Sequence, residues 1–202
     1  MKRKEFIMAY TLRVFRKPIQ GKQMELEKKL FEFRKLLGVQ GNGAVTRGYL
    51  NMNGPITHML QFDSLSEIQN YFAKSSEHSE KIMEMNKLSH NFTNVISERI
   101  KQPKSPLNRG DAKFMMQFWF TAKFGKRAQL AKTLIDNDLV EGAVNSMIGS
   151  FQAGDIVVSN AMKNLDEISG ILEMGEKYSS LMKELEPLVS NSSRHLSMLV
   201  FD

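Results

Sequence analysis

Three histidines stand in patterns that could support proton transfer in this chain of 202 residues. His58 lies in the apolar stretch "ITHMLQF", His195 in "SRHLSMLVF", and His78 among serines and acids in "YFAKSSEHSEKIMEM". Histidine is the side chain best suited to move a proton at neutral pH, and a base of this kind could form a substrate anion that passes an electron to oxygen. The alternatives stay open: His58 and His195 as structural strand residues, and His78 as a solvated helix residue.

A second group of residues could bind a substrate. Trp119, the one tryptophan, alternates with phenylalanines, so it shares a strand face with Gln117, which could satisfy the indole N–H or orient a ligand. Arg13 could hold an anionic group. Tyr49 and Asn94 are candidates to lie beside a histidine base. The structural alternatives are that Trp119 fills the interior and that Arg13 is exposed to solvent.

Several classes of chemistry have no motif in the sequence. There is no cysteine, no pair or cluster of histidines and acids at metal-ligand spacing, and no glycine-rich phosphate loop. We therefore expect no metal and no other cofactor. The lack of cysteine fits a reducing compartment, and the cytoplasm is the expected location.

Charge and hydropathy limit the partners. The net charge of +6 comes from 28 basic and 22 acidic residues that are mixed along the chain, so we expect no nucleic-acid binding. No stretch approaches the roughly 20 apolar residues of a membrane span, and the start "MKRKEFIMAYTLRVF" is interpreted as a first strand. A small apolar molecule is the expected partner.

Periodicity predicts the order β-α-β-β-α-β in the first half of the chain. Apolar residues at spacings of four, three and four predict a helix over 22–37, closed by Gly38, and a second helix capped by Asp63 or Ser64 with a break near Ser75 and Ser76. The predicted strands are 6–16, 44–52, 56–62 and 92–100.

The second half repeats this order. "EFIMAYTLRVF" matches "KFMMQFWFTAK" at an offset of 108, and "GAVTRGYLNMNG" matches "GAVNSMIGSFQAG" at an offset of 99 to 100. The change of offset predicts a first helix or entry loop about nine residues shorter in the second copy. At the offset of 108, Ala9, Thr11 and Arg13 correspond to Gln117, Trp119 and Thr121. The predicted elements are strands 113–124, 146–152, 156–162 and 194–201 and helices 127–140 and 166–189.

The repeat predicts an α+β fold of two tandem ferredoxin-like units, 1–100 and 113–202, joined by a linker at 101–112 that holds two prolines and a glycine. Each unit would be a four-stranded antiparallel sheet with its helices on one face. Because the strand 113–124 is apolar on both faces, we expect the two sheets to pack face to face as a pseudo-dimeric α/β barrel, with a pocket between them. Exposed sheet edges also leave a homodimer possible.

With its repeated order and its segments "YFAKSSEHSEKIMEM" and "EKYSSLMKELEPLV", the chain resembles the dimeric α/β-barrel superfamily, which includes antibiotic-biosynthesis-type monooxygenases and NIPSNAP-like proteins. The resemblance covers nearly the whole chain and implies a single-chain version of this fold. Members include cofactor-free quinol oxygenases and haem-degrading oxygenases. The haem-degrading branch has its histidine further along the second helix, where this chain has Lys81 and Ile82.

Two functions remain open from the sequence. The first is a cofactor-independent, monooxygenase-like enzyme acting on an apolar aromatic or polyketide-like substrate, which requires a histidine in a pocket. The second is a non-catalytic small-ligand-binding or stress-associated module of the same fold, whose pocket would lack a base. The presence or absence of a histidine in the pocket discriminates between these two functions.

Overall fold

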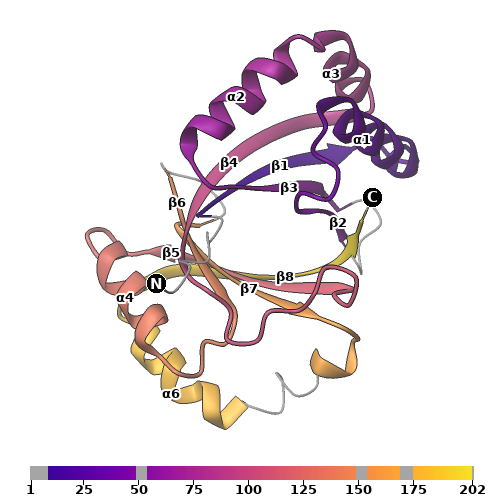
Figure 1. The fold of residues 1–202 in the computed structure, drawn as a ribbon. Helices are drawn as coiled ribbons and strands as arrows, with labels where there is room; N and C mark the ends of the chain where they lie inside the picture. The colour runs from indigo at the N-terminus through magenta and orange to yellow at the C-terminus, as the bar shows by residue number, and fades with distance from the viewer. Residues whose placement is uncertain (1–8, 49–53, 149–153, 169–174, 202) are drawn as a thin grey trace, which may run out of the picture. The chain divides into compact units, whose positions relative to one another are not determined.

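The computed structural model describes residues 9–48, 54–148, 154–168 and 175–201 (Figure 1). The chain divides into two compact units. Unit 1 consists of Met1–Ile96 with Val200–Asp202, and unit 2 of Ser97–Leu199. No helix in the described ranges is long and apolar enough to cross a membrane.

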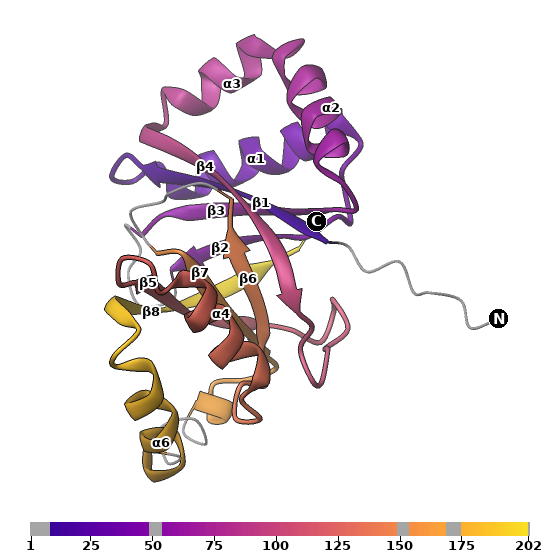
Figure 2. The same ribbon diagram turned by 90° about the vertical axis from the view of Figure 1, so that its left-hand side faces the viewer.

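Unit 1 has the predicted order of elements. Its sheet has the strand order β4-β1-β3-β2, and β3 pairs antiparallel with both β1 and β2. Helices α1, α2 and α3 cover one face of this sheet (Figures 1 and 2). The elements are β1 (Tyr10–Pro18), α1 (Gln23–Leu37), β2 (Ala44–Gly48), β3 (Ile56–Phe62), α2 (Leu65–Ser76), α3 (Ser79–Asn86) and β4 (Ser89–Lys101).

Local chemistry explains where these helices begin and end. Gly38 ends α1 in the left-handed conformation, with φ of 69°, that glycine adopts most readily. The Ser64 hydroxyl accepts a hydrogen bond from the Glu67 N–H at 3.2 Å and caps α2, as predicted. The break predicted near Ser75 and Ser76 is confirmed, because α2 ends at Ser76. Both hydroxyls donate to backbone carbonyls of the preceding turn, a contact that weakens helix continuation.

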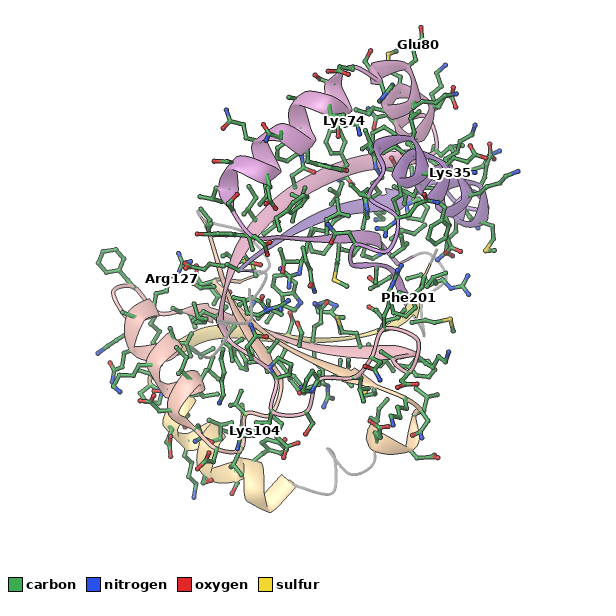
Figure 3. All side chains as sticks on the ribbon, viewed as in Figure 1. Lys35, Lys74, Glu80, Lys104, Arg127 and Phe201 are labelled. Atoms are coloured by element: carbon green, nitrogen blue, oxygen red, sulfur yellow. The ribbon has the colours of Figure 1, made fainter. Side chains whose placement is uncertain are left out.

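The core of unit 1 lies between the helices and the sheet. Leu26, Leu30 and Phe33 of α1 pack with Leu12 of β1 and Leu60 of β3 in one buried cluster. The opposite faces of the helices carry charged side chains such as Lys35 and Glu80, which are exposed (Figure 3). This division is the expected pattern for amphipathic helices on a sheet.

Unit 2 repeats the architecture with the strand order β8-β5-β7-β6, and the end of β4, Ser97–Lys101, pairs with β6. The predicted strand 194–201 begins five residues earlier, at Val189, because the helix before it ends at Leu185. Residues 149–152 of the predicted strand 146–152 and 169–174 of the predicted helix 166–189 lie outside the described residues. The elements are β5 (Phe114–Ala122), α4 (Arg127–Asp136), β6 (Ala143–Met147), β7 (Ile156–Met162), α6 (Gly175–Leu185) and β8 (Val189–Val200).

The pairing registers correct the offset of the repeat. Tyr10 of β1 faces Phe62, and Phe114 of β5 faces Met162, which is 100 residues after Phe62. The first strands therefore correspond at an offset of 104, since 114 − 10 = 104, and the offset of 108 is wrong. Offsets of 104 and 100 also relate the hydrogen bond from the Ile19 N–H to the Leu88 carbonyl (2.9 Å) to its counterpart in unit 2, from the Lys123 N–H to the Leu188 carbonyl (2.8 Å).

Two sequence inferences change with the offset. The first helix has 15 residues in unit 1 and 10 in unit 2, so it is shorter by five residues (15 − 10 = 5) and not by nine. The counterparts of Gln117 and Trp119 are Arg13 and Phe15, and not Ala9 and Thr11. The pattern of a strand repeats every two residues, so a slip of four leaves every side chain on its predicted face.

Candidate functional site

A pocket of about 120 Å³ lies in unit 1, and all of the residues that line it belong to that unit. Residues of β1, β3 and β4 form its floor, and residues of α1, α2 and α3 form its roof. Its apolar lining consists of Val14, Leu30, Phe33, Phe72, Ile82, Met85 and Phe92. Its polar lining consists of Arg16, His58, Tyr71, Ser75 and Asn94. We call this space the unit 1 pocket.

His58 reaches the pocket because of its register in β3. It stands opposite Val14 on β1 and Val45 on β2, and opposite residues on neighbouring strands share a face. The same face carries Leu12 and Leu60, which pack in the core beneath the helices. His58 is therefore on the helix side of the sheet, with 2% of its surface exposed.

The pocket lies on a different face from the one expected. From the sequence we expect a pocket between the two sheets, and the face to which His58 points is left open. The unit 1 pocket lies on the helix side, where Val14 and His58 stand side by side beneath Leu30 and Phe33 of α1. Asn94, a candidate neighbour of a histidine base, lines this pocket together with His58.

Arg16 is the one cation in the wall of the pocket. Only 4% of its surface is exposed, and its Nη1 donates to Asn86 Oδ1 at 2.7 Å and to Ser89 Oγ at 3.4 Å. The guanidinium lies 4.8 Å from the ring centroid of Phe92, a cation–π contact. Burial lowers the pKa of Arg16, and the nearby Tyr71 raises it. Arginine nevertheless stays protonated in proteins, so a positive charge is held in the wall.

Tyr71 supplies a proton donor at neutral pH. Burial raises the pKa of its phenol, while Ser75, Arg34 and Arg16 lower it by smaller amounts. The ring of Tyr71 packs at a centroid distance of 5.8 Å against both Phe62 and Phe72. These contacts fix the ring, so the phenol keeps one position at the pocket wall.

The opening of the pocket lies along β4. Phe92 has 46% of its surface exposed and Asn94 is also exposed, although both line the pocket. The other end of the pocket is closed by buried residues such as Leu30 and Met85. A ligand would therefore enter past one aromatic ring and one amide.

Three further sequence candidates gather on one face of the unit 2 sheet. Gln117 stands opposite His195 on one side and Ser159 on the other, and its Nε2 donates to Ser159 Oγ at 3.3 Å. Trp119 follows on the same face and is 3% exposed. Trp119 points away from the helices, because its neighbours Phe118 and Phe120 pack against the helical core.

His195 itself is exposed, and its Nε2 lies 3.1 Å from Ser193 Oγ. Arg13 and His78 do not line the unit 1 pocket. Arg13 is buried on the face of β1 away from the helices, so the structural alternative, an arginine exposed to solvent, is wrong. His78 precedes α3 as its N-terminal flanking residue, is half-buried and does not line the pocket. Tyr49 lies outside the described residues.

Sequence reasoning missed Arg16, Tyr71 and Ser75 as site residues. A signal for the floor was present in the alternation of "ITHMLQF": His58 has the parity of Ile56, Leu60 and Phe62, the more apolar half of the strand. The more apolar half faces the core. No comparable signal marks the roof residues, because a tyrosine and a serine on a helix are ordinary core and surface residues.

The equivalent positions of unit 2 are filled by apolar side chains. By the corrected register, Val14, Arg16 and His58 correspond to Phe118, Phe120 and Val158. These three residues pack with the helices of unit 2 in its core. Arg16 and His58, two of the three polar floor residues of the pocket, thus have no polar counterparts.

No group of three or more His, Asp or Glu residues that could hold a metal ion occurs in the part of the chain that the structure describes. The polar groups that line the unit 1 pocket are an imidazole, a guanidinium, a phenol, a hydroxyl and an amide.

Comparison with solved structures shows the fold. The chain is similar to an "anthrone oxidase-like protein" (TM-score 0.68, 10% identity, covering 96% of this chain and 92% of the other). It is also similar to a "putative monooxygenase" from Fusobacterium nucleatum (0.66, 12%, 95% and 92%) and to another from Lactobacillus acidophilus (0.62, 10%, 95% and 93%). No family model and no curated protein sequence matches the chain.

These likenesses show the fold of the protein. The chain has a dimeric α/β-barrel fold built from ferredoxin-like units, so the fold class predicted from the sequence and the resemblance to proteins of this fold are confirmed. At 10% to 12% identity the likeness concerns the fold, and the function must be argued from the pocket.

Proposed function

We propose that this protein is a cofactor-independent, oxygenase-like enzyme that acts on a small aromatic molecule in the unit 1 pocket, with His58 as the base. The observation that carries the proposal is a buried histidine in the wall of a largely apolar pocket. Such a pocket binds the ring, and the imidazole can accept a proton from it. The similar structures, one of an "anthrone oxidase-like protein" and two of a "putative monooxygenase", support oxygen chemistry.

The proposed reaction needs no external reductant. His58 removes a proton from an acidic C–H or O–H group, and the resulting anion gives one electron to O₂. The superoxide and the substrate radical then combine at carbon. Loss of water then converts the oxygenated ring carbon, which has kept one hydrogen, into a carbonyl, so that one oxygen atom enters the substrate and the other leaves as water. The substrate supplies all the electrons, and Tyr71 can donate a proton to the departing oxygen.

The volume of the pocket selects the size of the substrate. An apolar cavity of about 150 Å³ holds one benzene molecule, and the unit 1 pocket of about 120 Å³ is of the same order. A single ring is therefore the proposed reactive part. A larger polyketide-like molecule would have to leave its other rings outside, past Phe92 and Asn94.

A second function uses the same pocket without turnover. In a non-catalytic binding module, His58 would only orient a ligand through a hydrogen bond. The exposed opening at Phe92 and Asn94 is compatible with this function as well. Binding and turnover must therefore be measured separately.

The test follows oxygen uptake by the purified chain with a panel of monocyclic hydroquinones and cyclic CH-acidic ketones, and ligand binding by calorimetry. We expect turnover in the wild type, a loss of about 10²- to 10⁴-fold in His58→Gln, and little change in binding. His90→Gln is the matched control, because His90 is exposed on β4 and does not line the pocket. The native mass of the same sample reports whether two chains associate.

The outcomes separate the alternatives. Binding without oxygen uptake in any variant would favour the binding module. Equal turnover in wild type and His58→Gln would refute the role of His58. If His195→Gln abolished turnover instead, the reaction would belong to the unit 2 face that carries Gln117 and His195.

A further inference from the structure

We propose that the unit 1 pocket takes an anionic ligand, a single aromatic ring carrying a carboxylate, and that Arg16 binds this group. The inference rests on the proposed use of the pocket and adds the class of its ligand. It starts from one residue that the oxygen chemistry does not use. That residue is a buried cation in the wall of an otherwise uncharged pocket.

Arg16 has no counter-ion among the described residues. None of the pocket-lining residues is acidic, and the ion pairs found in the described part of the chain do not include Arg16. Its two hydrogen-bond acceptors, Asn86 and Ser89, are neutral. A buried charge without a partner of opposite sign is unfavourable, so a ligand that supplies a negative charge gains the interaction.

The guanidinium also has a donor to spare. Nη1 makes both hydrogen bonds to the protein, and the buried Nε has no hydrogen-bond partner among the described residues. The edge that carries Nε is one along which a carboxylate can accept two parallel hydrogen bonds from an arginine. Phe92 covers a face of the guanidinium, so its ring does not compete for the in-plane N–H donors.

The neighbours of Arg16 suit such a ligand. Tyr71 is close enough to Arg16 for each to shift the pKa of the other, and it keeps a proton that an anionic oxygen could accept as a hydrogen bond. The rings of Phe92, Phe72 and Phe33 offer apolar contacts to an aromatic ring. Charge and ring are therefore recognised within the same small pocket.

A purely structural role explains less of the geometry. The bonds of Arg16 to Asn86 and Ser89 connect β1 to the junction of α3 and β4. Unit 2 makes the same junction with Phe120 at the equivalent position, and the bond from the Lys123 N–H to the Leu188 carbonyl closes it at 2.8 Å. The fold therefore does not require an arginine here, and the structural role leaves the Nε edge unexplained.

The test compares two probes of nearly equal shape, benzoate and benzamide, by isothermal titration calorimetry. In the wild type we expect benzoate to bind at least about 10-fold more tightly than benzamide, since hydrogen bonds to a charged group are the stronger ones. Arg16→Met should abolish this preference and leave the affinity for benzamide within about twofold. Arg16→Lys should keep part of it, because the charge remains but the planar edge is lost.

Arg47→Met is the matched control. Arg47 lies in the same unit on β2, contacts Glu27 at 3.6 Å and does not line the pocket, so its replacement should leave the preference for benzoate unchanged. Thermal unfolding of each variant checks that it is folded. If Arg16→Met is unfolded, the comparison of Arg16→Lys with the wild type decides the question.

Each result decides for or against the inference. A preference for benzoate that disappears with Arg16 supports it. Equal binding of the two probes, or a preference that survives in Arg16→Met, overturns the anion site but leaves the pocket and the proposed function standing. Failure of both probes to bind the wild type overturns the inference, while the oxygen-uptake assay still decides the proposed function separately.

Discussion

Filling the unit 1 pocket with a larger side chain should stabilise the protein and abolish ligand binding. The change is Val14→Phe, which gives β1 the side chain that β5 carries at the equivalent position, Phe118. Val14 lines the pocket directly, next to His58. The chain itself shows that phenylalanine is compatible with this position of the fold.

The size of the effect follows from the pocket volume. At about 24 cal/mol for each Å³ of cavity, a pocket of about 120 Å³ accounts for at most about 3 kcal/mol (120 × 24 cal/mol). The pocket is open at Phe92, and one phenylalanine fills only part of it, so we expect a gain of about 1 kcal/mol. For a chain of this length that corresponds to a rise of about 2–4 °C in the unfolding temperature.

The assay is urea denaturation together with calorimetric titration of an aromatic ligand. Val45→Phe is the matched control: Val45 flanks His58 on the other side, is fully buried and does not line the pocket. There the same substitution should cost about 1–3 kcal/mol through overpacking. If Val14→Phe were as destabilising as Val45→Phe, or bound the ligand with wild-type affinity, the reasoning about this pocket would be refuted.

Two predictions concern stability elsewhere in unit 1. Gly43→Ala should be clearly more destabilising than Gly21→Ala in urea denaturation. Both glycines have a φ near +75°, but an added Cβ lies 2.1 Å from the Met59 carbonyl oxygen at Gly43 and meets nothing within 4 Å at Gly21. An equal loss of stability in the two variants would contradict the close approach at Gly43. Hydrogen bonds from Lys81 and Lys29 lower the pKa of Glu84 to about 2, so its stabilising contribution should be complete above pH 4.5 and lost as the pH falls towards 2. Glu84→Gln should therefore reduce the difference between the urea midpoints of unfolding at pH 6 and pH 3. Glu80→Gln on the same helix is the control and should leave this difference unchanged.

The fold could be predicted from the sequence because strands and helices leave strong periodic signals. The strands 56–62 and 156–162 were predicted with the bounds of β3 and β7, since each is a short apolar run between turn signals. The prediction failed for the alignment of the first strands of the two units, which depends on how the strands pair. The offset of 108 for the first strands was wrong by four residues, because an alternating pattern matches itself after any even slip and only the partner strand fixes the register.

The candidate site was harder to predict because it depends on which face each strand turns to the helices. His58 and Asn94, both candidates from the sequence, line a pocket that lies on the helix side of the sheet, whereas the sequence placed the pocket between the two sheets. Arg16 was missed although it shares the parity of Leu12 and Val14, the apolar half of β1. An arginine on an apolar strand face is a usable signal, because burying an unpaired charge there needs a reason.

The difference between the two units favours a functional origin for the pocket. Both units have the same strand order and the same closing hydrogen bond, yet unit 2 places Phe118, Phe120 and Val158 where unit 1 has Val14, Arg16 and His58. The apolar version is compatible with the fold, and it avoids both the unfilled volume and the buried charge.

Stability alone therefore gives unit 1 no reason to keep its three residues. A ligand that fills the volume with a ring, shares a proton with the imidazole and neutralises the guanidinium would remove each unfavourable feature at once. The same ligand would stabilise unit 1 on binding, because a molecule that binds only the folded state shifts the unfolding equilibrium towards it. Unit 1 is therefore least stable when its pocket is empty, and only a bound ligand explains Val14, Arg16 and His58 together.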